Sequence, residues 1–265
     1  MLLAIDCGNT NIVFALYDGE VQAANWRIST DAKRSADEYF VMLTHLMQIK
    51  EFPVNLVTEV IIACVVPEVQ PKLQNMALRG FGVTPLVVGA VDVDLGIDVN
   101  IDQPGQAGAD RLVNAVAARA FHDLPAIVVD FGTATTIDLI GVNGAYEGGI
   151  IAPGVNLSVE ALYVAAARLP RLAVEPWAAD MPVLGKNTLA AMHSGIFWGY
   201  VSMVDGLIAR LRIEIGADFP VIATGGLAPL FADHMPVISI VDSDLTLKGL
   251  LRINAQSQKL KQGKI

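Results

Sequence analysis

The sequence predicts an α/β fold made of two similar halves. Short apolar runs typical of buried strands alternate with apolar residues at helical spacing, which is the pattern of a layered α/β protein. The sequence also contains an internal repeat: one apolar run ends in Asp6-Cys-Gly, and another ends in Asp130-Phe-Gly, 124 positions later. With 265 residues, the chain is long enough for two domains of about 130 residues each.

The first half is expected to open with a hairpin. Residues 2–5 and 11–17 predict two strands, and Asp18-Gly19 is a dipeptide typical of the turn after them. Ser35 and Glu38 form a capping box ahead of apolar residues at helical spacing. The capping box predicts a helix over 36–50. The hydrophobic pattern that follows predicts a strand over 60–66 and a helix over 67–79 closed by Gly80. It then predicts a strand over 85–88 and a helix over 112–121.

The second half is expected to repeat this plan. The strand ending at Asp130 is followed by a second strand and by another turn dipeptide, Asn143-Gly144. Further on, the sequence predicts helices over 161–168 and 187–215 and a strand over 221–223 that breaks at Gly225-Gly226. We therefore expect domains at residues 1–115 and 116–255, followed by a flexible tail at 256–265.

Composition narrows the class of protein. The chain carries a net charge of −9 and has no large basic cluster, so neither nucleic acid nor a membrane surface is an expected partner. Its two cysteines are too few for a disulfide framework, and no long apolar run or signal sequence is present, so we expect a cytoplasmic protein. A hydrophobic content of 53% indicates a large interior, a buried subunit interface, or both.

The two Asp-x-Gly turns are candidates for phosphate binding. Glycine lets the backbone approach an anion, and successive N–H groups with hydroxyl or amide side chains can surround phosphate oxygens. In the first turn these residues are Asp6, Cys7, Gly8, Asn9 and Thr10. Asp6 could then hold a cation or its bound water. The alternative is a simple Asx-turn with no ligand, which needs only the Asp and the Gly.

Two such turns at strand ends would form the walls of a nucleotide cleft between two similar domains. Gly225-Gly226 could add a flat backbone surface for adenine or ribose, although an ordinary turn explains the pair equally well. Three aspartates, Asp6, Asp110 and Asp130, would then border a site for a polyanion. Their mutual repulsion predicts a divalent metal ion, which bridges phosphate oxygens in phosphoryl transfer.

A third motif, Gly108-Ala109-Asp110-Arg111, opens the predicted helix at 112–121. Asp110 could be the N-cap of that helix, or it could accept the proton of an attacking hydroxyl. Arg111 opposes the helix dipole, so it requires a nearby anion, either a carboxylate of the protein or one on a ligand.

Taken in order along the chain, these motifs resemble those of type III pantothenate kinases. The resemblance spans position 6 to about 250 and rests on the ordered set more than on any one element. Ile101 departs from it, because members commonly carry a tyrosine in the corresponding place. The set comprises Asp6-x-Gly-Asn-Thr-Asn, Gly108-x-Asp-Arg, Asp130-x-Gly-Thr-Ala-Thr, Gly148-Gly-x-Ile-x-Pro-Gly, Leu169-Pro, Asn187-Thr with Ser194-Gly, and Gly225-Gly.

The resemblance implies two duplicated actin-like (ribonuclease H-like) domains, a homodimer, and ATP-dependent phosphorylation of pantothenate to 4′-phosphopantothenate, the first step of coenzyme A synthesis. Asp110 would be the catalytic proton acceptor. Asp130 would bind a monovalent cation, K⁺ or NH₄⁺. The divalent metal ion, Mg²⁺, and its assignment to Asp6 come from the residues themselves, as described above. The remaining expected contacts are Asp6, Cys7, Gly8, Asn9, Thr10, Asn11, Ile12, Val13, Thr133, Gly225 and Gly226 with ATP, and Gly108, Ala109, Asp110, Arg111 and Thr188 with pantothenate.

Two other functions remain open at this stage. A kinase of the same fold that acts on another small alcohol would keep the two turns but not the Gly-x-Asp-Arg motif. A non-catalytic, nucleotide-binding regulator would be expected to lose Asp110 or to add a DNA-binding element.

Overall fold

The computed structural model describes residues 1–166, 169–261 and 263. The chain forms two compact units. The first comprises Met1–His122 together with Leu245–Ile265, and the second comprises Asp123–Asp244.

The first unit is built on a five-stranded mixed sheet in the order β3-β2-β1-β4-β5. β1 pairs with β2 antiparallel and with β4 parallel, so β1 lies in the middle of the sheet. Its apolar run is buried on both faces, as a central strand requires. The strands are β1 (Leu2–Cys7), β2 (Asn11–Asp18), β3 (Val21–Ser29), β4 (Glu59–Cys64) and β5 (Leu86–Val87).

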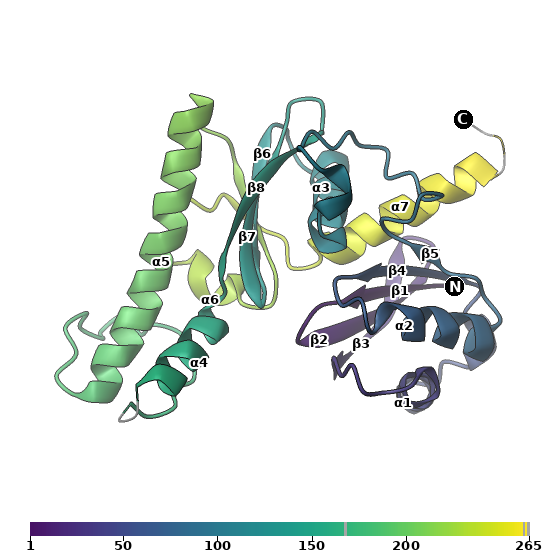
Figure 1. The fold of residues 1–265 in the computed structure, drawn as a ribbon, viewed down its shortest axis with the longest axis horizontal. Helices are drawn as coiled ribbons and strands as arrows, with labels where there is room; N and C mark the ends of the chain where they lie inside the picture. The colour runs from purple at the N-terminus through teal and green to yellow at the C-terminus, as the bar shows by residue number, and fades with distance from the viewer. Residues whose placement is uncertain (167–168, 262, 264–265) are drawn as a thin grey trace. The chain divides into compact units, whose positions relative to one another are not determined.

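Helices cover both faces of this sheet (Figure 1). α1 (Ala36–Ile49) and α2 (Gln70–Met76) cover the face that carries the odd-numbered residues of β1, such as Ile5 and Cys7. α3 (Ala109–Phe121) and α7 (Leu245–Lys261) cover the opposite face, which carries Leu2 and Ala4. Since side chains alternate along a strand, Asp6 projects toward the face covered by α3 and α7.

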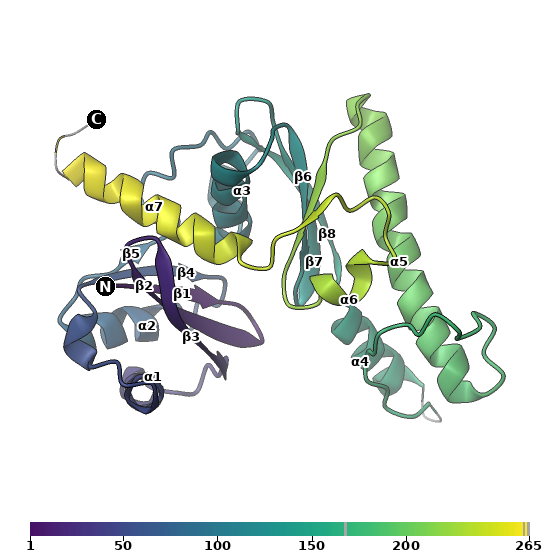
Figure 2. The same ribbon diagram turned by 180° about the vertical axis from the view of Figure 1, so that it is seen from behind.

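The second unit repeats the topology of the first. Its sheet has the order β10-β9-β6-β7-β8, in which β6 pairs antiparallel with β7 and parallel with β9. Figure 2 shows α5 beside this sheet, with α6 nearby. The elements are β6 (Ala126–Phe131), β7 (Ala134–Ile140), β8 (Tyr146–Pro153), α4 (Val155–Ala165), α5 (Thr188–Ile215), β9 (Val221–Thr224), α6 (Ala228–Ala232) and β10 (Ile240–Val241).

The duplication inferred from the sequence is confirmed at the level of strands. β1 and β6 have six residues each and are offset by 124 positions, so Asp6 and Asp130 hold the same place in equivalent central strands. Both predicted hairpin turns are present, with Gly19 at φ +60° and Gly144 at φ +81°. The capping box is also confirmed, because the Ser35 hydroxyl accepts from the Glu38 N–H at 3.2 Å.

Several element boundaries differ from those expected. The helix expected over 67–79 is α2, which ends at Met76 and continues as a π-helical turn to Phe81; the left-handed cap is Gly82, not Gly80. The helix expected over 161–168 begins earlier, at Val155, because Gly154 is its N-cap. Residues 167–168 of that prediction lie outside the described residues.

The compact units also differ from the expected domains. The boundary expected after residue 115 falls inside α3, a continuous helix whose apolar side is buried against the first sheet. The segment expected as a flexible tail, 256–265, is helical through residue 261 as part of α7. α7 belongs to the first unit, where Asn254 Nδ2 donates to Glu59 Oε2 at 2.6 Å.

No helix among the described residues is long and apolar enough to cross a membrane.

Candidate functional site

The first Asp-x-Gly turn joins the central strand of the first unit to its neighbour. β1 ends at Cys7 and β2 begins at Asn11, and the Gly8 N–H donates to the Asn11 carbonyl at 3.0 Å. Asn9 and Thr10 are exposed at the tip of the turn. The turn therefore presents polar side chains and backbone to solvent on a rigid two-strand support.

Thr30, just after β3, supports this turn from the side. Its hydroxyl donates to the Gly8 carbonyl at 2.7 Å, and its N–H donates to the Thr10 carbonyl at 3.0 Å. Sequence reasoning missed this residue, since Thr30 is separated from the motif by a whole strand and only the register of β2 with β3 brings them together.

The Gly-x-Asp-Arg motif forms the start of α3. Gly108 is the N-cap, so Asp110 is not, and Asp110 instead accepts from the Arg111 N–H at 2.8 Å. A Cβ atom on Gly108 would lie 2.5 Å from Asp110 Oδ1. The glycine is therefore required by the position of the Asp110 carboxylate.

Burial raises the pKa of Asp110 above its ordinary value of 3.8, because a carboxylate loses solvation in this place. The N–H and the charge of Arg111 lower this pKa, but they offset the effect of burial only in part. A carboxylate whose pKa is raised in this way holds a proton more readily, as a general base must.

A cavity of about 590 Å³ lies beside this motif in the first unit. Such a volume is typical of small-molecule sites, which range from about 300 to 1,000 Å³. Gly108 and Ala109 line it at the N-terminal end of α3, where the helix dipole favours a negatively charged group. The other lining residues include the amide side chains Gln70 and Gln74 of α2.

The second Asp-x-Gly turn follows β6, and the Gly132 N–H donates to the Ala134 carbonyl at 3.2 Å. Gly154 packs directly against it, because a Cβ atom there would overlap the Thr133 carbonyl oxygen. Gly154 belongs to the glycine-rich motif recognised in the sequence, but its contact with the turn could be found only in the structure.

Asp130 lies between two buried hydroxyl groups. Its register partners are Thr136 on β7 and Thr224 on β9, so all three side chains project from the same face of the sheet. Neither Thr136 Oγ1 nor Thr224 Oγ1 has a hydrogen-bond partner within the described part of the chain. Buried hydroxyls are normally hydrogen-bonded, so this pair beside a carboxylate could hold a cation or another polar ligand.

The two glycines of the Gly225-Gly226 pair differ in the space around them: a Cβ atom would clash at Gly225 but not at Gly226. Gly225 adopts φ +91°, and a Cβ atom there would lie 2.5 Å from Asp130 Oδ1 and 2.7 Å from the Phe131 nitrogen. A Cβ atom on Gly226 would meet no atom of the described residues within 4 Å. Gly225 is therefore needed to make room for Asp130, whereas Gly226 leaves an open surface.

The predicted site residues fall into two sets. The first unit holds the Asp6–Val13 segment and Gly108–Arg111, and the second holds Asp130, Thr133 and the two glycines. Thr188 is also in the second unit, exposed as the first residue of α5, whose N-cap is Asn187. The Asn187 side chain caps α5 by accepting from the Ala190 N–H at 2.9 Å.

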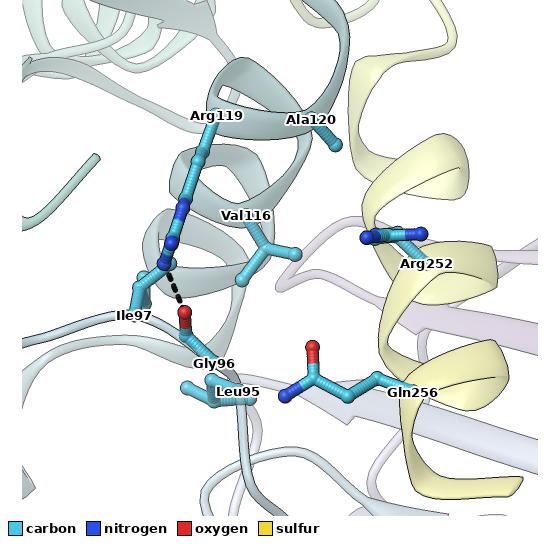
Figure 3. Close-up of a pocket in the computed structure, with 8 residues that line it drawn as sticks. All are labelled: Leu95, Gly96, Ile97, Val116, Arg119, Ala120, Arg252 and Gln256. Atoms are coloured by element: carbon cyan, nitrogen blue, oxygen red, sulfur yellow. Dashed lines mark hydrogen bonds between the residues drawn. The ribbon is translucent and has the colours of Figure 1, made fainter. Parts of the chain in front are cut away.

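A smaller cavity of about 190 Å³ contains none of the predicted site residues (Figure 3). It lies between α3, α7 and the segment at Leu95–Ile97. Arg119 on one side donates to the Gly96 carbonyl, and Arg252 lines the other side.

Comparison with known proteins places the chain in a family. A family model described as type III pantothenate kinase matches residues 2–210. A type III pantothenate kinase of Paramagnetospirillum magneticum is 52% identical over 257 residues, covering 97% of this chain and 98% of the relative. Its counterpart in Zymomonas mobilis is 50% identical over 261 residues, covering 98% and 94%.

Solved structures share the fold at low sequence identity. MreB 5 of Spiroplasma citri bound to AMPPNP has a TM-score of 0.57 at 10% identity, covering 100% of this chain and 98% of that one. A Campylobacter jejuni protein described as a Baf-family transcriptional activator has a TM-score of 0.63 at 19% identity, covering 97% and 99%. These likenesses confirm the predicted actin-like α/β fold, and the family match over most of the sequence shows that the chain belongs to the type III pantothenate kinases.

Proposed function

We propose that this chain transfers the γ-phosphate of ATP to the primary hydroxyl of pantothenate and so forms 4′-phosphopantothenate, the first step of coenzyme A synthesis. The main support for this proposal is the partly buried Asp110 carboxylate at the start of α3, next to Gly108 and Ala109, which line a cavity of suitable volume. The family match and the identity of about half of all residues with pantothenate kinases support the same reaction.

The first turn would hold phosphate oxygens of ATP. The exposed Asn9 and Thr10 can donate hydrogen bonds, and Thr30 fixes the backbone on which they stand. In phosphoryl transfer the protein contributes mainly positioning and charge stabilisation, so a turn anchored by three strands suits this role.

The acceptor would occupy the cavity beside Gly108. Its carboxylate would pair with Arg111, near the positive end of the α3 dipole. Asp110 would accept the proton of the attacking hydroxyl. Gly108 leaves room for that carboxylate, because a Cβ atom there would lie 2.5 Å from Oδ1.

Phosphoryl transfer would also need positive charge beside the ATP phosphates, which a divalent cation bound with ATP would supply. Asp6 is the residue that we assign to it. The part of the chain described by the structure contains no group of three or more His, Cys, Asp or Glu residues placed to hold a metal. One carboxylate fits Mg²⁺, which commonly keeps several waters and takes its other ligands from substrate phosphates.

A monovalent cation fits the second turn. The Asp130 carboxylate supplies charge, and the buried Thr136 and Thr224 hydroxyls supply neutral oxygen atoms that lack hydrogen-bond partners within the described residues. Hard oxygen donors of this kind suit K⁺, and NH₄⁺ could donate hydrogen bonds to the same oxygens. Bound in this way, the cation would offset the charge of Asp130 near the Thr133 turn.

We also propose a homodimer that uses an apolar surface of the second unit. Large apolar side chains are exposed on α4 and around the start of α5, where a monomer would expose them to water. The surface consists of Leu157, Tyr163, Val164, Val183, Leu184 and Leu189, with exposed fractions from 39% to 78%. A second copy of the chain would cover this surface.

One assay tests the proposed reaction. Purified protein is given Mg-ATP, and ADP release is followed with and without pantothenate and with and without potassium. We expect ADP release to require pantothenate and to be stimulated by potassium over sodium at equal ionic strength. Turnover that is indifferent to pantothenate would refute the substrate, and turnover indifferent to both K⁺ and NH₄⁺ would refute the cation site.

The catalytic role of Asp110 is tested by Asp110→Asn. This substitution keeps the size of the side chain but removes the proton acceptor. We expect kcat to fall by about 10² to 10⁴-fold, the usual contribution of a general base. Binding of pantothenate by calorimetry should persist, and a variant with wild-type kcat would show that Asp110 is not the base.

A further inference from the structure

The two cysteines of the chain lie side by side at the ends of two neighbouring strands, next to the first Asp-x-Gly turn (Asp6–Thr10), which is called the phosphate turn below. Cys7 and Cys64 are register partners on the adjacent parallel strands β1 and β4, and they project from the same face into the same apolar cluster. The Cys64 thiol donates to the Val66 carbonyl at 3.3 Å, just beyond the end of β4. We propose that this pair is an oxidative modification site, at which a hydroperoxide joins Cys7 and Cys64 in a disulfide.

The spacing of the strands permits this bond. Neighbouring strands lie about 4.8 Å apart, and disulfides join residues whose Cα atoms are about 4.4 to 6.8 Å apart. The preferred Cβ separation in a disulfide, about 3.8 Å, is about 1 Å shorter than the strand spacing. Forming the bond would therefore draw the ends of β1 and β4 together by a small distance.

The two thiols differ in access. Cys64 lines the cavity of about 590 Å³, whereas Cys7 is only 1% exposed. Cys64 is thus the thiol that an oxidant entering the cavity meets first.

The reaction proceeds in two balanced steps. The Cys64 thiolate attacks one peroxide oxygen, the O–O bond breaks, and the departing oxygen takes a proton to leave as water or an alcohol. The Cys7 sulfur then displaces the hydroxyl of the Cys64 sulfenic acid, which leaves as water. Together the two thiols lose two electrons and two protons, and the peroxide is reduced.

This modification would affect the phosphate turn directly. Cys7 stands between Asp6 and Gly8, so a shift of its backbone moves the residues that we assign to the cation and to phosphate. A displacement of about 1 Å can lower the rate of an enzymatic reaction on the order of 100-fold. This consequence rests on the proposed function, whereas formation of the disulfide does not.

The bond should also be reversible. A disulfide that must close a longer Cβ separation than it prefers is more easily reduced than a relaxed one. A dithiol should therefore restore both free thiols and the activity.

Mass spectrometry tests the bond without reference to kinase activity. The full-length wild-type protein is treated with hydrogen peroxide, alkylated, digested without reductant and analysed. We expect one intramolecular Cys7–Cys64 cross-link, which disappears on treatment with dithiothreitol. Unchanged free thiols, cross-links between separate chains, or a Cys64 sulfinic acid with Cys7 still free would overturn the proposal.

Activity measurements on two variants test the consequence. Wild type, Cys64→Ser and Cys64→Ala are each compared with their own untreated rate, so any basal effect of the substitution cancels. We expect peroxide to lower the wild-type rate on the order of 100-fold, reversibly, and to leave both variants at their own rates. Equal loss in a variant that cannot form the bond would overturn the link to activity.

If the preparation shows no kinase turnover, the cross-link still decides whether the modification site exists. A cross-link without turnover would refute the proposed function alone, and turnover without a cross-link would refute the modification site alone.

Discussion

The Asp110 carboxylate shows how single residues define the chemistry of the site. Its pKa is raised by burial, its Oδ1 accepts from the Arg111 N–H at 2.8 Å, and Gly108 leaves room for it where a Cβ would collide with Oδ1. The sequence identified both Gly108 and Asp110 but left open whether the aspartate merely capped a helix. That question required backbone geometry, because only the dihedral angles show that Gly108 is the N-cap.

Burial of Asp110 should cost stability at neutral pH. Because its folded-state pKa lies above the ordinary value of 3.8, the folded form binds a proton more readily than the unfolded form. The resulting stabilisation is present below that ordinary value and is lost as the pH rises through the raised pKa. Asp110→Asn should therefore unfold at higher urea concentration than wild type at about pH 7.5.

The difference should shrink as the pH is lowered toward about 4, where the wild-type carboxyl is increasingly protonated. Asp180→Asn, at an exposed loop position, serves as the control and should leave the free energy of unfolding unchanged within about 0.5 kcal/mol. An Asp110→Asn variant that is less stable than wild type at neutral pH would contradict the account.

At the scale of elements, the first Asp-x-Gly turn is supported by a residue outside its motif, Thr30. Thr30 bonds to Gly8 and Thr10 by its side chain and its backbone, and so links the end of β3 to the turn. Thr30→Val keeps the shape and the backbone bond but removes the hydroxyl. We expect the KM for ATP to rise about 5- to 10-fold, the effect of about 1 kcal/mol for one hydrogen bond.

Thr30→Ser is the matched control, because it restores a hydroxyl at the same position. Its KM for ATP should remain close to that of wild type. If valine and serine behave alike, the Thr30 hydroxyl does not support the turn.

The elements themselves could be predicted where the signal was local. The hairpins followed from Asp18-Gly19 and Asn143-Gly144, and α1 followed from its capping box. α7 was missed because it is stabilised by tertiary contacts. Its buried side packs against α3 and β1 of the first unit, which are far from α7 in the sequence. The start of α4 was missed because its N-cap, Gly154, has no capping side chain.

At the scale of the whole molecule, the duplicated topology places two aspartates in equivalent positions with different surroundings. Asp6 has Val13 and Ala63 as register partners, whereas Asp130 has Thr136 and Thr224. Sequence comparison of the halves found the aspartates, but only the sheet register could show the hydroxyls around the second. The two equivalent aspartates thus have different chemical surroundings.

The apolar surface of the second unit leads to a prediction about assembly. Val164 is 73% exposed on α4, and Val164→Glu would bury a charge if a second copy covers it. Sedimentation at micromolar concentration should show a wild-type dimer and a largely monomeric variant with reduced kinase activity.

Val21→Glu provides the control, because Val21 is 70% exposed on β3 of the first unit. It should remain dimeric. A wild-type monomer that is fully active, or a Val164→Glu dimer, would contradict this assignment of the interface.

In the proposed reaction, the phosphoryl group of ATP reaches the primary hydroxyl of pantothenate in the site that contains Asp110. The most direct measurement supplies γ-labelled ATP and pantothenate to the wild-type protein and determines the product by mass spectrometry and phosphorus NMR. The account predicts a single labelled phosphomonoester at the 4′ position, with its rate reduced about 10² to 10⁴-fold in Asp110→Asn. Label found only in inorganic phosphate, or pantothenate recovered unmodified, would contradict it.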